Sequence, residues 1–156
     1  MANVMILSTG DIRYKFCGAA LQSMGHDCWE FFPEHTADNR KSFMDACERR
    51  SIDFIACEFT LFSDRTPLSY LAWAGWKGAV LSFGPSVPGF RGIFDPRLKH
   101  EKITTFFYDE CKPMDAAFFL KFKRAVARAL GELPQEDLRP INFAAACARL
   151  CKNKAI

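Results

Sequence analysis

Two patterns of apolar residues alternate along the chain. Short apolar runs, typical of buried strands, are followed by longer segments in which apolar residues recur every three or four positions, as on one face of a helix. Turn-forming residues such as Gly10, Gly25 and Gly131 separate the segments. The pattern predicts strands at 4–7, 28–32, 52–59, 78–83 and 103–108, and helices at 12–24, 40–50, 66–76 and 114–130.

Strands and helices that alternate in this order are typical of a parallel sheet with helices on both faces. We therefore expect an α/β fold, a doubly wound five-stranded parallel sheet in a flavodoxin-like three-layer sandwich. The predicted domain spans residues 3–131. Residues 132–156 are expected to form a linker, which contains Pro134 and Pro140, and an appended amphipathic helix at 141–152.

The carboxyl ends of the strands are the places where such sheets hold their functional residues. The segments to examine are therefore 8–11, 58–61, 82–85 and 109–113. Residues 84–100 contain three Pro and three Gly and predict a loop longer than is usual between two elements.

Composition narrows the class of protein. A chain of 156 residues with 49% hydrophobic and 25% charged residues is long enough to bury its own core. No segment reaches the roughly 20 apolar residues of a membrane span, and the first residues lack the basic and apolar regions of a signal peptide. The seven cysteines, an odd number spread over predicted strands and helices, favour free thiols in a reducing compartment. We expect a cytoplasmic protein without membrane contact.

The charge is uneven but small. The formal net charge is +3, and the basic excess lies in residues 120–156. Arg149, Lys152 and Lys154 belong to this basic part, for which a solvated helix face is the favoured interpretation over contact with nucleic acid or an acidic partner. The sequence does not predict nucleic acid binding.

Four segments match, in order, the motifs of one known family. They are residues 11–26, a helix with a glycine exit; 52–61, an apolar strand that carries an acid; 80–82, a strand that ends in Ser; and 112–115, which begins with Lys-Pro. With this order and spacing the chain resembles the receiver domain of response regulators over about residues 3–130. The resemblance implies a role in two-component signalling, where a receiver is phosphorylated on an Asp beside a bound Mg²⁺.

The resemblance also implies a degenerate phosphorylation pocket, made by Ser8, Thr9, Asp11, Glu58, Ser82 and Lys112. Mg²⁺ prefers carboxylate oxygens, but the family's acidic pair falls here on Leu7–Ser8 or Ser8–Thr9, and Asp11 is expected to cap the following helix. Glu58 takes the phosphoacceptor position. Its extra methylene moves the carboxylate by about a bond length, more than a reacting group tolerates.

These departures predict a pseudo-receiver, a signalling or adaptor module that is no enzyme and has no cofactor and no metal. A contact between Glu58 and Lys112 is expected to hold it in one signalling state. It would act by protein–protein interaction with a kinase, another regulator or a second copy of itself, as a homodimer. An interaction surface of aromatic residues is expected at Trp73, Trp76, Phe90 and Tyr108, with core packing as the alternative for these residues.

Two further readings stay open. A small flavodoxin-like or Rossmann-like domain could bind a nucleotide or sugar at the strand carboxyl ends, with Ser8-Thr9-Gly10 and the 84–100 loop forming the site. A conventional receiver would need Asp53 or Asp64 as phosphoacceptor, which the predicted strand ends disfavour.

The pairs His26/Cys28 and Cys147/Cys151 lack a second ligand pair at zinc spacing, and buried thiols are the preferred interpretation.

Overall fold

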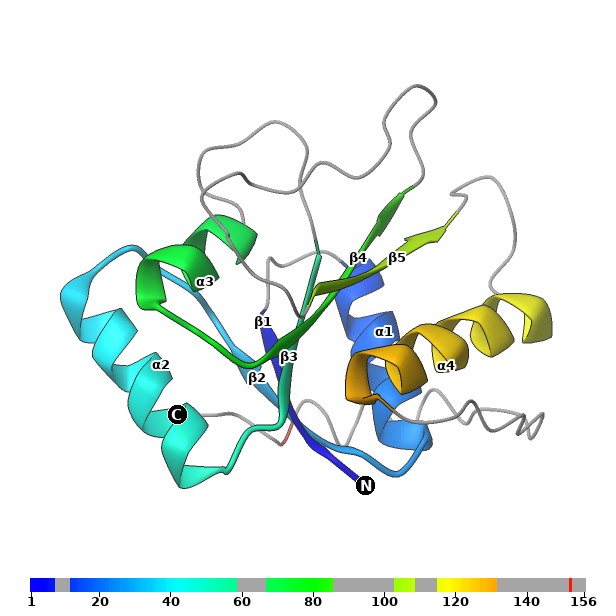
Figure 1. Ribbon diagram of the computed structural model, residues 1–156, viewed down its shortest axis with the longest axis horizontal. Helices are drawn as coiled ribbons and strands as arrows, with labels where there is room; N and C mark the ends of the chain where they lie inside the picture. Colours follow the sequence, from blue (N-terminus) through cyan, green and yellow to red (C-terminus); the bar gives the residue numbers. More distant parts are fainter. Residues whose placement is uncertain (8–11, 59–66, 86–102, 109–114, 132–151, 153–156) are drawn as a thin grey trace.

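The computed structural model describes residues 1–7, 12–58, 67–85, 103–108, 115–131 and 152. In chain order its elements are β1 (Asn3–Leu7), α1 (Ile12–Ser23), β2 (Asp27–Phe31), α2 (Ala37–Arg49), β3 (Phe54–Glu58), α3 (Pro67–Ala74), β4 (Ala79–Pro85), β5 (Ile103–Tyr108) and α4 (Ala116–Leu130). The strands form one parallel sheet in the order β2-β1-β3-β4-β5, with helices on both faces (Figure 1). This is the flavodoxin-like, doubly wound arrangement, so the predicted fold class is confirmed.

The two faces of the sheet have separate cores. One core is formed with α1 and α4 and the other with α2 and α3. Consecutive residues of β1 alternate between them: Val4 and Ile6 join the first core, and Met5 and Leu7 the second. All four side chains are fully buried, which explains why this strand is a continuous apolar run in the sequence. Within the described parts of the chain, no helix is long and apolar enough to span a membrane.

The start of α2 differs from the prediction. The sequence predicts this helix from residue 40, but it begins at Ala37 and its N-cap is Thr36. The side-chain oxygen of Thr36 accepts the N–H of Asn39 at 3.2 Å and so satisfies one of the free donors of the first turn. Phe43, Ala46 and Cys47 form the buried face of α2, at the spacing of one helical face.

The last helix ends as predicted and starts slightly later. Asp115 caps α4 by accepting the N–H of Phe118 at 3.1 Å, so the helix begins at Ala116 rather than at residue 114. Gly131 ends it with φ of 70°, a left-handed conformation that suits glycine. Phe122, Ala125 and Val126 of α4, three and four positions apart, lie in the first core.

β4 is longer than predicted. The sequence ends this strand at Phe83 and assigns Gly84 and Pro85 to a loop, yet both residues pair with β5, Pro85 opposite Tyr108. β3 ends at Glu58, opposite Phe83, so Pro85 has a strand on only one side. Proline is tolerated at such an edge position, because an N–H missing on the side without a neighbouring strand removes no hydrogen bond of the sheet. Residues 86–100 of the predicted loop, and the predicted helix 141–152 except Lys152, lie outside the described residues.

Candidate functional site

The carboxyl ends of β1, β3, β4 and β5 lie along one edge of the sheet, where the sequence places its site (Figure 1). Four of the six predicted pocket residues, Ser8, Thr9, Asp11 and Lys112, lie outside the described residues. The structure locates the other two, Glu58 and Ser82, on neighbouring strands. Their relative position is therefore the part of the predicted pocket that can be described.

Glu58 and Ser82 are not opposite each other. Glu58, the last residue of β3, pairs with Phe83, whereas Ser82 pairs with Cys57. Because β4 continues to Pro85, Ser82 lies three residues before the end of its strand rather than at the end, as the motif comparison assumes. Ser82 therefore lies one step further into the sheet than Glu58.

The Ser82 side chain is enclosed by protein. Ser82 is 1% exposed, and its Oγ has no hydrogen-bond partner among the residues that the structure describes. Alternation along β4 places it on the same face as Val80, which belongs to the core under α2 and α3. A buried hydroxyl without a partner costs about 1 to 3 kcal/mol of stability. Such an atom calls for a structural or functional explanation.

The predicted aromatic surface is divided between two environments. Trp73, on α3, is 38% exposed. Trp76 is partly buried, donates its Nε1–H to the carbonyl of Ala79 at 3.2 Å and packs against Phe43, so it has the core role that the sequence left open. Tyr108 is the last residue of β5, and Phe90 lies outside the described residues.

Trp73 belongs to a surface that the sequence did not reveal, which we call the α2–α3 patch: Phe32, His35, Arg40, Met44 and Trp73. The ring of His35 lies 5.4 Å from that of Trp73, and the Arg40 guanidinium carbon lies 5.5 Å from the Trp73 ring centroid. Arg40 and Met44 are one helical turn apart on α2. Only this last spacing is visible in the sequence; the approach of α3 is not.

Asn39 fastens this patch to the core. Its Oδ1 accepts the hydroxyl of Tyr70 at 2.7 Å and the N–H of Glu34 at 3.0 Å, and its Nδ2 donates to the carbonyl of Phe32 at 3.0 Å. Tyr70 is fully buried, and burial raises the pKa of its phenol. The phenol is therefore neutral and remains a hydrogen-bond donor. Through Asn39, the segment between β2 and α2 is connected to Tyr70 of α3.

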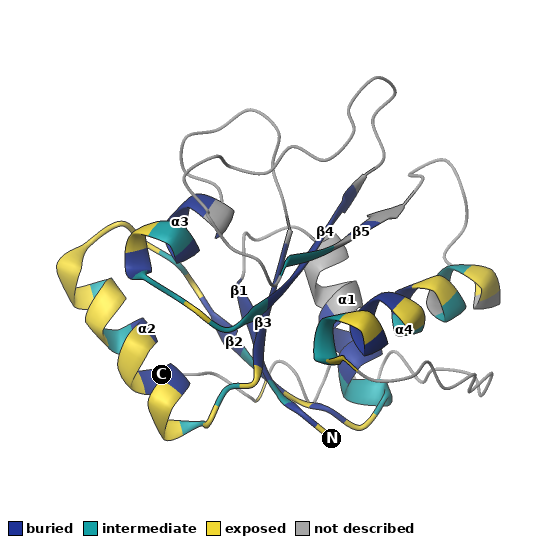
Figure 2. Cartoon of the chain, in the orientation of Figure 1, coloured by how far each residue is buried: buried dark blue, intermediate teal, exposed yellow. Residues whose placement is uncertain are grey.

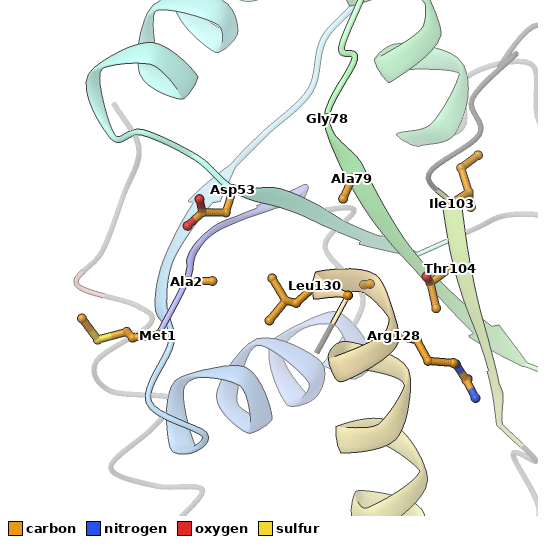
Figure 3. A pocket seen from close by; sticks show the side chains of 11 residues that line it. Met1, Ala2, Asp53, Gly78, Ala79, Ile103, Thr104, Arg128 and Leu130 are labelled. Carbon is orange, nitrogen blue, oxygen red and sulfur yellow. The ribbon is translucent and has the colours of Figure 1, made fainter. Parts of the chain in front are cut away.

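The described residues also line an open pocket of about 710 Å³, at the opposite, amino edge of the sheet (Figure 3). Ala79 and Leu130 line it, from the start of β4 and the end of α4. Asp53 also lines it, and its Oδ2 accepts the N–H of Asn3 at 2.8 Å. Its place before β3 is the wrong end for a receiver phosphoacceptor, as the sequence indicates.

Three cysteines of the described part, Cys28, Cys47 and Cys57, are buried. Burial raises the pKa of the Cys47 thiol to about 12, and that of Cys28 in the same direction with help from the nearby Asp27 charge. Cys28 and Cys47 are thus protonated at neutral pH and are poor nucleophiles. No group of three His, Cys, Asp or Glu side chains that could hold a metal ion occurs among the residues the structure describes.

Comparison with known proteins gives no assignment. No family model matches the chain, and neither a curated protein nor a solved structure matches it significantly.

Proposed function

We propose that this chain is a receiver-like module that signals through protein–protein contacts and does not transfer a phosphoryl group. The observation that carries the proposal is the parallel sheet of order β2-β1-β3-β4-β5 whose third strand ends on Glu58. Receivers carry the phosphoacceptor Asp at this place. The fold alone does not decide the function, so the proposal depends on the residues at the strand ends.

Two further features support a site without phosphoryl transfer. The segment after β1 supplies no acidic pair for Mg²⁺ at Leu7, Ser8 or Thr9, and hard carboxylate ligands are what this ion requires. Ser82, the residue that the resemblance assigns to phosphoryl contact, is buried within β4. Catalysis of phosphoryl transfer depends almost entirely on positioning and charge stabilisation, and both are weakened here.

The partner in this proposal is a protein: a kinase, another regulator or a second copy of the chain. Exposed aromatic and apolar side chains next to a cation, as in the α2–α3 patch, are a composition common in protein interfaces. A contact of Glu58 with Lys112, in place of a phosphorylated Asp, would hold the module in one state.

The test is an amide NMR titration of the full chain with Mg²⁺ and then beryllofluoride, which mimics an acyl phosphate. We expect no saturable change at the residues around Glu58, Ser82 and Lys112. The Glu58→Gln variant provides a second measurement, because loss of the carboxylate should shift the signals around Lys112 if the two side chains are in contact. A saturable, Mg²⁺-dependent change in the wild-type protein would contradict the proposal and indicate an ordinary phosphorylated receiver.

A further inference from the structure

Three of the large apolar side chains that the described part of the chain exposes belong to the α2–α3 patch. Phe32 is 56% exposed, and Met44 and Trp73 are each 38% exposed. They come from the segment after β2, from α2 and from α3, respectively. The two helices lie on the same side of the sheet (Figure 2). Single exposed apolar residues are ordinary, but a group of them beside a cation is typical of a binding surface.

The aromatic part of the patch is packed against the buried residue Tyr70. The Trp73 ring lies 5.7 Å from that of Tyr70, whose hydroxyl is bonded to Asn39, and His35 packs against both rings. A partner that binds here does not have to order a mobile tryptophan, so less of the contact energy is lost to conformational entropy. Rigid aromatic side chains are accordingly frequent among residues that dominate binding.

Arg40 gives the patch its charge. Its guanidinium lies over the Trp73 ring, and no carboxylate within the described residues forms an ion pair with it. Arginine has five N–H donors, and a face-on contact with an indole uses none of them in a carboxylate bond. Asp38 and Asp45 are the acids of α2 nearest to Arg40 in sequence. Both lie about 150° away from Arg40 around the helix axis. Within the described part of the chain, the patch thus offers a cation without an ion pair, beside an aromatic anchor.

We infer that the α2–α3 patch docks an acidic segment of a partner protein, which places a carboxylate on Arg40 and an aromatic side chain on Trp73. Charge complementarity selects this class of partner, because no described residue supplies the guanidinium with an anion and its N–H fork fits a carboxylate. The inference rests on the proposed function as an adaptor and names the surface and the partner chemistry. This surface is separate from the strand-end pocket around Glu58.

The experiment uses ¹⁵N-labelled full chain and a pair of peptides. The probe is acetyl-Gly-Ser-Glu-Asp-Phe-Glu-Ser-Gly-amide, and its match has Gln and Asn in place of Glu and Asp. The chain has three tryptophans, so the indole N–H signals of Trp29 and Trp76 serve as internal controls for that of Trp73. We expect the acidic probe to shift the Trp73 signal and to bind at least fivefold more tightly than its match.

Three variants sharpen this test. Arg40→Gln should make the two peptides bind equally without changing the thermal unfolding of the chain. Trp73→Ser should weaken the acidic probe at least tenfold; because it also removes the ring packing with Tyr70 and His35, its binding is measured below its own unfolding temperature. Glu34→Gln removes an exposed acid next to His35 and should strengthen binding of the acidic probe by less than threefold. Equal affinity for the two peptides in the wild type, unchanged binding by Trp73→Ser, or no binding of the acidic probe would each overturn the inference.

The same sample separates this inference from the proposed function. If neither Mg²⁺ with beryllofluoride nor the acidic probe changes the NMR signals, the inferred docking at the patch is wrong, but the proposal of a module without phosphoryl transfer is retained. If it responds to beryllofluoride and binds the probe through Trp73, the patch stands and the proposed function is wrong.

Discussion

Gly78 lies against the indole ring of Trp76, with no room for a side chain between them. A Cβ placed on Gly78 would collide with Cζ2, Cε2 and Cη2 of that ring. The ring cannot swing away freely, because its Nε1–H bonds to the carbonyl of Ala79 and its face packs near Phe43. The entrance of β4 therefore depends on a glycine for space.

Replacing Gly78 with Ala should lower the free energy of unfolding by about 1 to 3 kcal/mol, the usual cost of forcing atoms into a packed region. Urea unfolding followed by tryptophan fluorescence measures this loss. The control is the same substitution in a Trp76→Leu background, where the ring is absent and the cost should fall. An equal cost in both backgrounds would mean that the collision with the indole is not the cause.

The bond between Asn39 and Tyr70 joins residues that are 31 positions apart in the chain. Asn39→Ala should cost about 1 kcal/mol, because it removes the 2.7 Å acceptor of the phenol and leaves only the backbone carbonyl of the same residue, at 3.4 Å. It should also speed amide exchange at Glu34, whose N–H bonds to the same Oδ1. A double-mutant cycle with Tyr70→Phe should give a coupling of at least about 0.5 kcal/mol, and additive losses would contradict a direct bond.

The features that the sequence predicted correctly depend on local patterns. The run from Val4 to Leu7 is buried on both faces of the sheet, and Phe43, Ala46 and Cys47 face the core at helical spacing. Gly131 ends α4 in the left-handed conformation that favours glycine. Apolar periodicity and helix-ending glycines act over a few residues, so a single sequence is enough to read them.

The features that it missed depend on distant partners. Asn39 looks like a helix cap, but its amide is engaged by Tyr70 of another helix, and Thr36 caps α2 instead. Pro85 looks like a loop residue, but it remains in β4 because β3 has already ended. The α2–α3 patch likewise requires the position of α3 against α2. None of these relationships leaves a local pattern in the sequence.

The buried thiols predict a specific loss of stability in alkali. Folding raises the pKa of Cys47 from its ordinary 9.0 to about 12, so below pH 9 the thiol is protonated in both states and does not affect stability. Between pH 9 and pH 12 the unfolded chain releases a proton that the folded chain keeps. Stability should then fall by up to about 1.4 kcal/mol per pH unit for each such thiol.

Urea unfolding at pH 7.5, 9 and 10 tests this prediction. Cys47→Ala should reduce the decline above pH 9 but not remove it, since burial raises the pKa of Cys28 in the same direction. An identical decline in the variant and the wild type would show that Cys47 does not carry the effect.

Ser82 provides the sharpest test of the strand-end site. Its Oγ is enclosed without a hydrogen-bond partner, next to Cys57 across the sheet, so Ser82→Ala removes an unsatisfied polar atom and leaves only a very small space. The free energy of unfolding should stay the same or rise by about 1 kcal/mol.

Thr36→Ala, which removes the cap of α2, should lower the free energy of unfolding by about 1 kcal/mol and shows that such a change is measurable. A loss of more than about 1 kcal/mol in Ser82→Ala would mean that the hydroxyl is bonded in solution, to a buried water or a ligand. The strand-end site would then hold something that a module acting only through its surface does not need.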